Sequence, residues 1–195
     1  MATAASAHIS PEEYLERERK AEFKSEYFRG EVVAMAGGTY EHSLIIANLI
    51  GELHAALRRG NCRLSSTDVR LAIASSNLYT YPDVMVVCGD PVFAGNRRDT
   101  VCNPVLVIEV LSESTEAYDR GEKFQSYRSI SSLMEYVMVA QDRTHLEQYT
   151  RQPDGRWLLT DHNDSASRIR FEAVGVDLQL SNVYEKVDFQ SGQAR

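Results

Sequence analysis

Several features are absent from this 195-residue sequence, and each absence excludes a class of protein. No apolar run approaches the roughly 20 residues of a membrane-spanning helix. The first residues lack the basic start and sustained apolar segment of a secretory signal peptide. The three cysteines, Cys62, Cys88 and Cys102, are odd in number and far apart, which favours reduced thiols over a disulfide framework. We therefore expect a cytoplasmic protein without membrane contact.

Common catalytic motifs are also missing. The sequence has no Cys-x-x-Cys or His-Glu-x-x-His metal spacing and no Gly-x-Ser-x-Gly nucleophile turn. Gly37-Gly38 is not followed by the Gly-Lys-Ser/Thr of a phosphate loop. Cys88 and Cys102 have no obvious activating histidine, so a thiol nucleophile is not expected. The remaining candidates for chemistry are carboxylates.

Basic residues are fewer than acidic ones, so the net charge is −7 and the pI is about 5.3. This balance argues against broad electrostatic binding to a polyanion. It still permits a nuclease that holds a few phosphates with a bound cation and a local basic strip. Length and composition fit one globular domain, which we place at residues 10–187 between flexible tails at 1–9 and 188–195.

Periodicity and capping signals predict three helices. Ser10-Pro11-Glu12-Glu13 starts the first, which should reach about Lys24. The second should run from about Tyr40 to Arg59, with apolar residues at helical spacing. The third fits residues 115–129.

Strands are predicted between and after these helices. Residues 25–36 form a hairpin around Arg29-Gly30, and the near-continuous apolar runs 83–88 and 105–111 are typical of central strands covered on both faces. Residues 91–103 read as a loop. Other strands are predicted at 63–65, 68–73, 135–140, 146–151, 157–160 and 169–171, and a short helix from Ser181. The sequence thus predicts one mixed α/β domain with a central sheet, flanking helices and an antiparallel C-terminal half.

Two carboxylates stand beside the apolar strands. Asp83 follows Pro82 and so lies at a strand end, where it can reach a cleft; a turn aspartate that caps local backbone is the alternative. Glu109 lies inside Val107-Ile108-Glu109-Val110-Leu111, and a charge in so apolar a strand needs compensation. A buried ion pair or an exposed strand edge would also account for Glu109.

Lys123 belongs to a stripe at i, i+4 and i+8 on the third helix, together with Asp119 and Tyr127. Considered alone, Asp119 and Lys123 would form a surface ion pair worth a few tenths of a kcal/mol. Because this helix follows the Glu109 strand directly, Lys123 can instead lean over the strand end towards the carboxylates.

The ordered blocks around these residues resemble the Uma2 family of restriction-endonuclease-like proteins, in the PD-(D/E)xK nuclease superfamily. The resemblance covers roughly residues 10–185. It rests on the following segments: Glu26-Tyr27-Phe28-Arg29-Gly30-Glu31-Val32, Gly37-Gly38-Thr39 with Glu41-His42, Tyr81-Pro82-Asp83-Val84, Val107–Ser112 with Ser114-Thr115, and Asp119–Lys123 with Tyr127.

The resemblance implies a restriction-endonuclease-like core in which Asp83 and Glu109 bind the metal and Lys123 is the catalytic lysine. It also implies Glu26 as an additional ligand, His42 as a neighbour of the site, and a homodimer. The chain departs from the superfamily pattern two residues after Glu109, where Leu111 replaces lysine. Lys123 must then supply the ammonium from the helix. Glu113, where proline is expected, is a lesser departure.

These residues lead to a hypothesis of Mg²⁺- or Mn²⁺-dependent hydrolysis of DNA phosphodiesters. Asp83, Glu109 and the Val110 carbonyl would hold the cation, and Lys123 would orient the water or stabilise charge on the phosphate. One alternative is an inactive nuclease-like fold that binds nucleic acid or protein. An inverting glycosidase that uses Asp83 and Glu109 is a further alternative, but the single tryptophan makes a sugar platform improbable.

Overall fold

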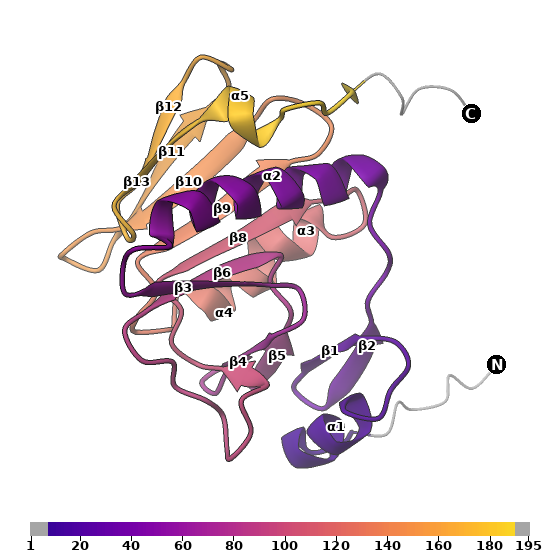
Figure 1. The fold of residues 1–195 in the computed structure, drawn as a ribbon. Helices are drawn as coiled ribbons and strands as arrows, with labels where there is room; N and C mark the ends of the chain where they lie inside the picture. The colour runs from indigo at the N-terminus through magenta and orange to yellow at the C-terminus, as the bar shows by residue number, and fades with distance from the viewer. Residues whose placement is uncertain (1–7, 190–195) are drawn as a thin grey trace, which may run out of the picture.

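Two β-sheets and a separate hairpin organise the chain in the computed structural model, which describes residues 8–189. Figure 1 shows the larger sheet in the upper part of the molecule and the smaller sheet below it. The chain passes from the smaller sheet to the larger at residues 81–83, directly before the strand that begins at Val84. This junction places Asp83 between the two sheets.

The smaller sheet has the strand order β2-β1-β5-β4-β7. Helix α1 (Pro11–Glu18) packs beside it, and Ser10 caps this helix by accepting a 3.2 Å hydrogen bond from the Glu13 amide. The strands are β1 (Ser25–Phe28), β2 (Glu31–Ala34), β4 (Arg70–Ile73), β5 (Leu78–Thr80) and β7 (Thr100–Val101). Strands β1 and β2 form the hairpin predicted around Arg29-Gly30.

The larger sheet has the order β11-β10-β9-β8-β6-β3. Only the β8–β9 pair is parallel; the other pairs are antiparallel. The strands are β3 (Cys62–Ser66), β6 (Val84–Cys88), β8 (Leu106–Leu111), β9 (Glu135–Ala140), β10 (Leu146–Arg151) and β11 (Trp157–His162). Every residue of β8 is buried, as its apolar run predicts.

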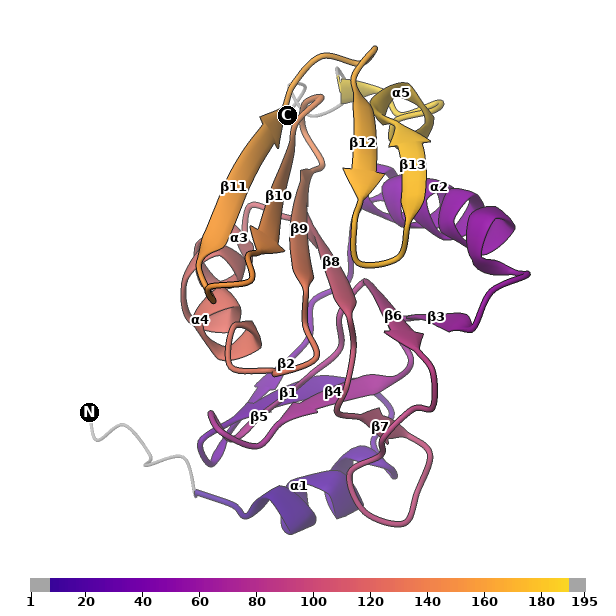
Figure 2. The ribbon, with the colours of Figure 1, turned by 90° about the vertical axis from the view of Figure 1, so that its left-hand side faces the viewer.

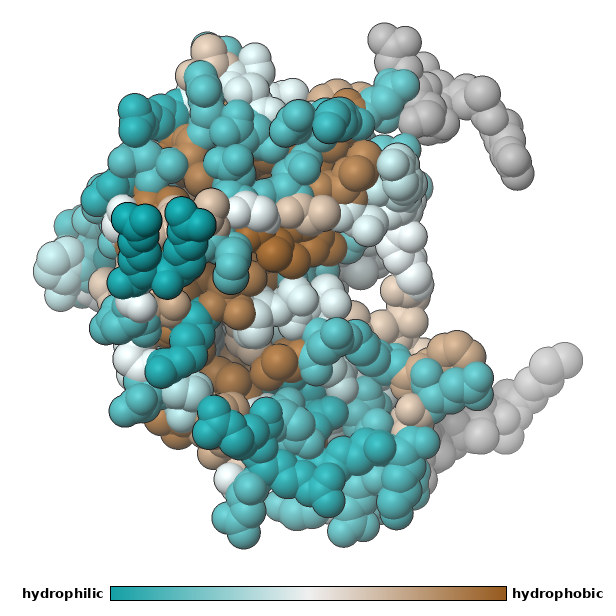
Figure 3. Space-filling model, viewed as in Figure 1, coloured by the Kyte–Doolittle hydropathy of each residue, from teal (hydrophilic) through white to brown (hydrophobic). Residues whose placement is uncertain are grey.

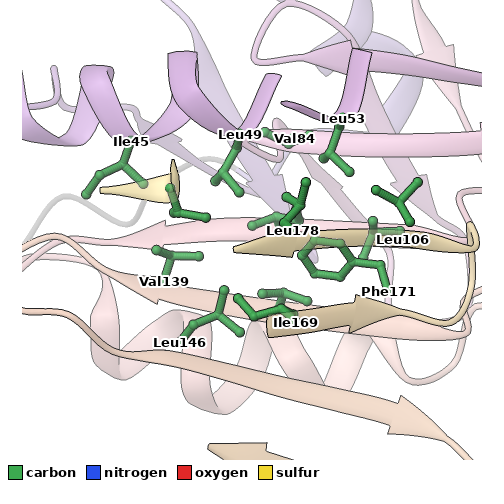
Figure 4. Close-up of a cluster of buried hydrophobic side chains, with 14 of the residues drawn as sticks. Ile45, Leu49, Leu53, Val84, Leu106, Val139, Leu146, Ile169, Phe171 and Leu178 are labelled. Atoms are coloured by element: carbon green, nitrogen blue, oxygen red, sulfur yellow. The ribbon is translucent and has the colours of Figure 1, made fainter. Parts of the chain in front are cut away.

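Each face of the larger sheet has its own core. Helix α2 (Tyr40–Leu57) covers one face together with β12 (Arg168–Phe171), β13 (Val176–Gln179) and α5 (Leu180–Val183). Figure 4 shows Leu49 and Leu53 of α2 pointing at Leu106, Phe171 and other apolar side chains. The segment that joins β8 to β9 covers the opposite face, and Figure 2 shows it on the left of the sheet with α2 on the right.

Alternation along β8 divides its side chains between these two cores. Leu106, Ile108 and Val110 pack towards α2, whereas Val107 and Leu111 pack towards the β8–β9 segment. Glu109 shares the face of Val107 and Leu111 and therefore points at that segment.

The predicted mixed α/β class, with a central sheet, flanking helices and an antiparallel C-terminal half, is confirmed. Helix α1 ends at Glu18 and not near Lys24. Strands β5 and β13 were not predicted, and β7 lies in the predicted loop 91–103. The predicted third helix is broken into α3 (Glu116–Tyr118), a π-helical turn (Asp119–Lys123) and α4 (Phe124–Tyr127).

The prediction of three reduced thiols is wrong, because Cys62 and Cys88 form a disulfide and only Cys102 is free. The two residues lie 26 positions apart in sequence but face each other directly across the β3–β6 pair. Strand pairing brings them together, which their sequence spacing does not reveal.

Two further observations concern the ends of the chain and the membrane. Ile9, which we placed in the N-terminal tail, packs against Tyr14 and Tyr27, and its amide donates to the Gly30 carbonyl at 3.1 Å. Residues 1–7 and 190–195 of the predicted tails lie outside the described residues. Within residues 8–189, no helix has the length and apolar character needed to cross a membrane.

Candidate active site

Asp83 and Glu109 come together because β6 and β8 are antiparallel neighbours. Val84 pairs with Ile108, so the residue before β6 lies beside Glu109. The Asp83 amide donates to Glu109 Oε2 at 3.3 Å, and the Val110 amide donates to Asp83 Oδ2 at 2.8 Å. Backbone contacts therefore hold both carboxylates at one position of the sheet.

Lys123 lies against this pair. Its Nζ is 3.0 Å from Glu109 Oε1, 3.2 Å from Asp119 Oδ1 and 3.4 Å from Glu26 Oε1. Only 6% of Lys123 and 2% of Asp119 are exposed. The Asp119–Lys123 contact is therefore a buried ion pair, and the alternative of a surface pair is wrong.

A π-helical turn carries Asp119 and Lys123. Such turns are rare, usually single, and frequent at functional sites. The turn runs from Asp119 to Lys123 and leads into α4, so that Tyr127, one turn later, also faces β8. The predicted stripe of Asp119, Lys123 and Tyr127 is present, and it is buried.

Glu26 and His42 reach the same cluster from other elements. Glu26 lies on β1 of the smaller sheet and accepts a hydrogen bond from the Thr80 hydroxyl. His42 lies in the first turn of α2, where its amide donates to the capping oxygen of Thr39 at 3.1 Å. The His42 Nε2 atom is 3.1 Å from the Val110 carbonyl oxygen and 3.5 Å from Asp83 Oδ2.

Burial controls the protonation of these groups. It raises the pKa of Glu109 to about 8, although the charge of Lys123 opposes the rise. It lowers the pKa of His42, but the hydrogen bond and charge of Asp83 outweigh this effect, so the net shift is upward. Burial also opposes the charge on Lys123, yet Glu109 and the other carboxylates raise the pKa of its ammonium well above the ordinary value. Lys123 is therefore a permanent cation.

Sequence reasoning did not identify the part played by Asp119, Thr80 and Tyr127. The Tyr127 hydroxyl donates to Glu109 Oε1 at 2.6 Å, and its side chain is fully buried. The helical stripe was the available signal, but spacing alone does not say whether a stripe faces solvent or a strand. Leu111, at the position where lysine is expected, is buried among apolar side chains.

The donor set suits a hard divalent cation. The carboxylates outnumber the ammonium of Lys123: they are Asp83, Glu109, Asp119 and Glu26. The buried Asp119 Oδ1 atom has the Lys123 ion pair but no aligned hydrogen bond. Oxygen ligands at about 2.1 Å in octahedral geometry lie roughly 3 Å from their neighbours. His42 Nε2 lies 3.1 Å from the Val110 oxygen and 3.5 Å from Asp83 Oδ2, so each of these oxygens is at the distance from His42 that an adjacent ligand would have.

A second group of potential ligands lies on β10 and β11. His145, Glu147 and Asp161 are close enough to share a metal ion. However, Arg120 donates to both Glu147 oxygens at 2.6 Å, and His145 Nε2 is 3.0 Å from Asp161 Oδ1. These charges are already paired within the protein, unlike the carboxylate excess around Lys123.

Residues 11–182 match the Uma2 family model, described as putative restriction endonuclease. Two uncharacterized proteins of Synechocystis sp., slr1290 and sll1609, are each 37% identical to this chain. The match with slr1290 covers 93% of this chain and 94% of slr1290. The match with sll1609 covers 88% of this chain and 97% of sll1609.

The fold also resembles a solved structure. A putative nuclease belonging to DUF820, from Anabaena variabilis, superposes with a TM-score of 0.72 at 14% identity, covering 90% of this chain and 97% of its own. At this identity the likeness concerns the fold alone. The match of the family model over residues 11–182 establishes that this chain belongs to the Uma2 family of putative restriction endonucleases.

Proposed function

We propose that this protein is a Mg²⁺- or Mn²⁺-dependent endonuclease that hydrolyses DNA phosphodiester bonds. The observation that carries the proposal is the convergence of Asp83, Glu109 and Lys123 at one point of the fold. Asp83 comes from the residue before β6, Glu109 from β8 and Lys123 from the π-helical turn. Family membership and the fold support the reaction class.

Asp83, Glu109 and the Val110 carbonyl would hold the cation, with Glu26 or His42 as possible additional ligands. When bound, a divalent cation polarises a phosphoryl oxygen and lowers the pKa of an attacking water. The carboxylate of Glu109, buried in an apolar strand, keeps its orientation because donors hold both of its oxygens.

Lys123 supplies the positive charge that the phosphate needs. An ammonium has three donors, and all three face carboxylates here. Glu26 has the longest of these contacts and the most exposed of the three carboxylate side chains, so it is the partner that Lys123 can exchange most readily for a phosphate oxygen or water. Lys123 then stabilises charge that develops in the transition state.

Cleavage of supercoiled plasmid by purified protein, with Mg²⁺ or Mn²⁺ and with EDTA, tests this function. We expect Glu109→Ala and Lys123→Ala each to lower the rate by about 100-fold or more. Arg156→Ala is the matched control, because Arg156 is an exposed cation whose ion pair with Asp154 lies in the turn between β10 and β11. Full metal-dependent cleavage by either site variant would overturn the assignment. Absence of both cleavage and metal binding in the wild type would favour the inactive binding module.

The proposal extends to assembly and location. A homodimer would present two sites to one duplex, and β2 offers an open sheet edge with Val32 and Val33 exposed. Sedimentation that shows a monomer at micromolar concentration would reject the dimer. We propose the cytoplasm as the compartment, although a disulfide such as Cys62–Cys88 is uncommon there.

A further inference from the structure

Tyr127 reaches the candidate site with its hydroxyl. Its hydroxyl donates to Glu109 Oε1 at 2.6 Å, a short distance typical of a hydroxyl donating to a carboxylate. None of the side chain is exposed, and its ring packs against Tyr136 with centroids 5.1 Å apart. A phenol hydroxyl is protonated at neutral pH, so Tyr127 donates to the carboxylate.

The two oxygens of Glu109 have different surroundings. Oε1 accepts from the Tyr127 hydroxyl and faces the Lys123 ammonium at 3.0 Å, which uses both of its lone pairs. Oε2 accepts only the longer, 3.3 Å hydrogen bond from the Asp83 amide. Oε2 therefore keeps a lone pair on the side of Asp83, where the proposed ligands gather.

We infer that Tyr127 is a positioning residue that fixes Oε1 of Glu109 and so presents Oε2, in one orientation, to the metal. This inference rests on the proposed function, because it assigns a role within the same site. Lys123 contacts the same oxygen but also Asp119 and Glu26, and it must be free to contact the phosphate. Among residues 8–189, the Tyr127 hydroxyl donates only to Glu109, so it can hold the carboxylate while Lys123 moves.

Mn²⁺ binding by the purified, metal-free protein tests the inference without relying on activity. The free ion is measured by electron paramagnetic resonance during a titration. Partners that orient a metal ligand typically contribute 10- to 100-fold in affinity, so we expect Tyr127→Phe to weaken Mn²⁺ binding by about 10-fold or more. In cleavage assays the loss should be recovered at high Mn²⁺ concentration, with KM for DNA unchanged.

Tyr136→Phe is the matched control. Tyr136 is equally buried and adjacent, but its hydroxyl donates to the main-chain carbonyl of Asp119 at 3.1 Å and not to Glu109. Removing that hydroxyl should change Mn²⁺ affinity less than about 2-fold, since it contacts a main-chain carbonyl and none of the proposed ligand atoms. Urea unfolding of both variants compares what each substitution costs in stability.

The outcomes separate the two proposals. Wild-type binding that Glu109→Gln abolishes supports the metal site itself. If Tyr127→Phe then binds Mn²⁺ as tightly as wild type, or if Tyr136→Phe weakens binding equally, the role of Tyr127 is overturned while the site stands. If wild type binds no Mn²⁺, the metal-dependent function and the role of Tyr127 both fail.

Discussion

At the scale of the residue, two buried glutamates in adjacent strands show how surroundings decide a role. Glu135 on β9 accepts from the amides of Glu172 and Ala173 and from the Gln148 side chain, at 3.0 to 3.1 Å. Glu109 on β8 instead lies close to Asp83 and Asp119, whose charges raise its pKa further after burial has done so. Neutral donors surround Glu135, whereas Glu109 belongs to a crowded group of carboxylates.

Glu109→Gln is therefore expected to stabilise the metal-free protein at pH 8, although it removes a proposed ligand. A carboxyl group whose pKa rises to about 8 on folding leaves the free energy of unfolding unchanged below about pH 4, where it is protonated in both states. Between pH 4 and pH 8 it lowers the free energy of unfolding progressively, because only the unfolded chain can ionise it freely. At pH 8 with EDTA, the neutral amide removes an ionisation cost of about 4–5 kcal/mol. It also places a donor against the groups that now donate to Glu109, which costs about 1–3 kcal/mol at every pH. The free energy of unfolding should therefore rise by about 2 kcal/mol at pH 8 and fall by about 1–3 kcal/mol at pH 4. Urea titrations at both pH values measure the difference.

Glu135→Gln is the control of opposite sign. Its amide group would place a donor against the main-chain donors that Glu135 now accepts from, at a cost of about 1–3 kcal/mol. Equal destabilisation by both substitutions would contradict the crowding argument for Glu109.

The sequence was sufficient to single out Asp83, Glu109 and Lys123, because charges beside buried apolar strands are conspicuous. It was not sufficient for Tyr127 or Asp119, whose roles depend on which way a helix is turned. Similarly, Cys62 and Cys88 meet only through strand pairing, which depends on contacts between distant segments.

At the scale of the element, the segment after β8 shows that a local sequence pattern can predict a helix without predicting its type. Residues 115–129 satisfy a helical pattern, but the chain forms a π-helical turn at Asp119–Lys123 between two short α-helical pieces. The buried contacts of Lys123 with Glu109 and Glu26 accompany this geometry. The helix propensities of single residues carry no information about tertiary contacts of this kind.

Gly121, in the middle of the π-helical turn, gives a prediction for this element. A Cβ added there meets no atom within 4 Å, and the position is helical. Because glycine loses more backbone freedom on folding than alanine does, Gly121→Ala should stabilise the protein by about 0.5–1 kcal/mol. Chemical unfolding measures the change, and retained metal binding would show that the turn keeps its shape.

Gly30→Ala is the contrasting substitution. Gly30 has a φ of 100° in the β1–β2 turn, and an added Cβ would collide with the His8 ring. The substitution should destabilise the protein by about 1 kcal/mol or more. A stabilising effect at Gly30, or a destabilising effect at Gly121, would contradict these conformational assignments.

At the scale of the whole molecule, the candidate site lies where the two sheets meet. Glu26 comes from the smaller sheet, Asp83 from the connection between the sheets, and Glu109 and His42 from the larger sheet and its covering helix. Figure 3 shows hydrophilic side chains over the upper and lower parts of one face, with a band of apolar side chains between them. The relative placement of the sheets therefore determines whether the site is assembled.

A buried polar network attaches α1 to the smaller sheet. Asp99 accepts from Arg19, at the end of α1, at 2.8 Å and lies 2.7 Å from Arg70 Nη2 on β4. The Arg70 guanidinium also donates to Tyr81, which in turn donates to Glu18. Through Tyr81, two residues before Asp83, this network connects the smaller sheet to the candidate site.

Asp99 should therefore govern part of the acid stability of the whole protein. The hydrogen bond from Arg19 and the charge of Arg70 lower the pKa of Asp99 to about 2. A depressed carboxyl pKa contributes stability that is complete above about pH 4 and is lost as the pH falls towards 2. Asp99→Asn should cost about 1–2 kcal/mol at pH 7 and remove part of the fall in stability between pH 4 and pH 2.

Asp154, whose partner Arg156 is an exposed near neighbour, is the control: Asp154→Asn should leave the pH profile of urea unfolding almost unchanged. If Asp99→Asn retains the wild-type acid profile, the network does not hold α1 to the smaller sheet, and Glu26 and Asp83 must owe their placement to the apolar contacts of the two sheets alone.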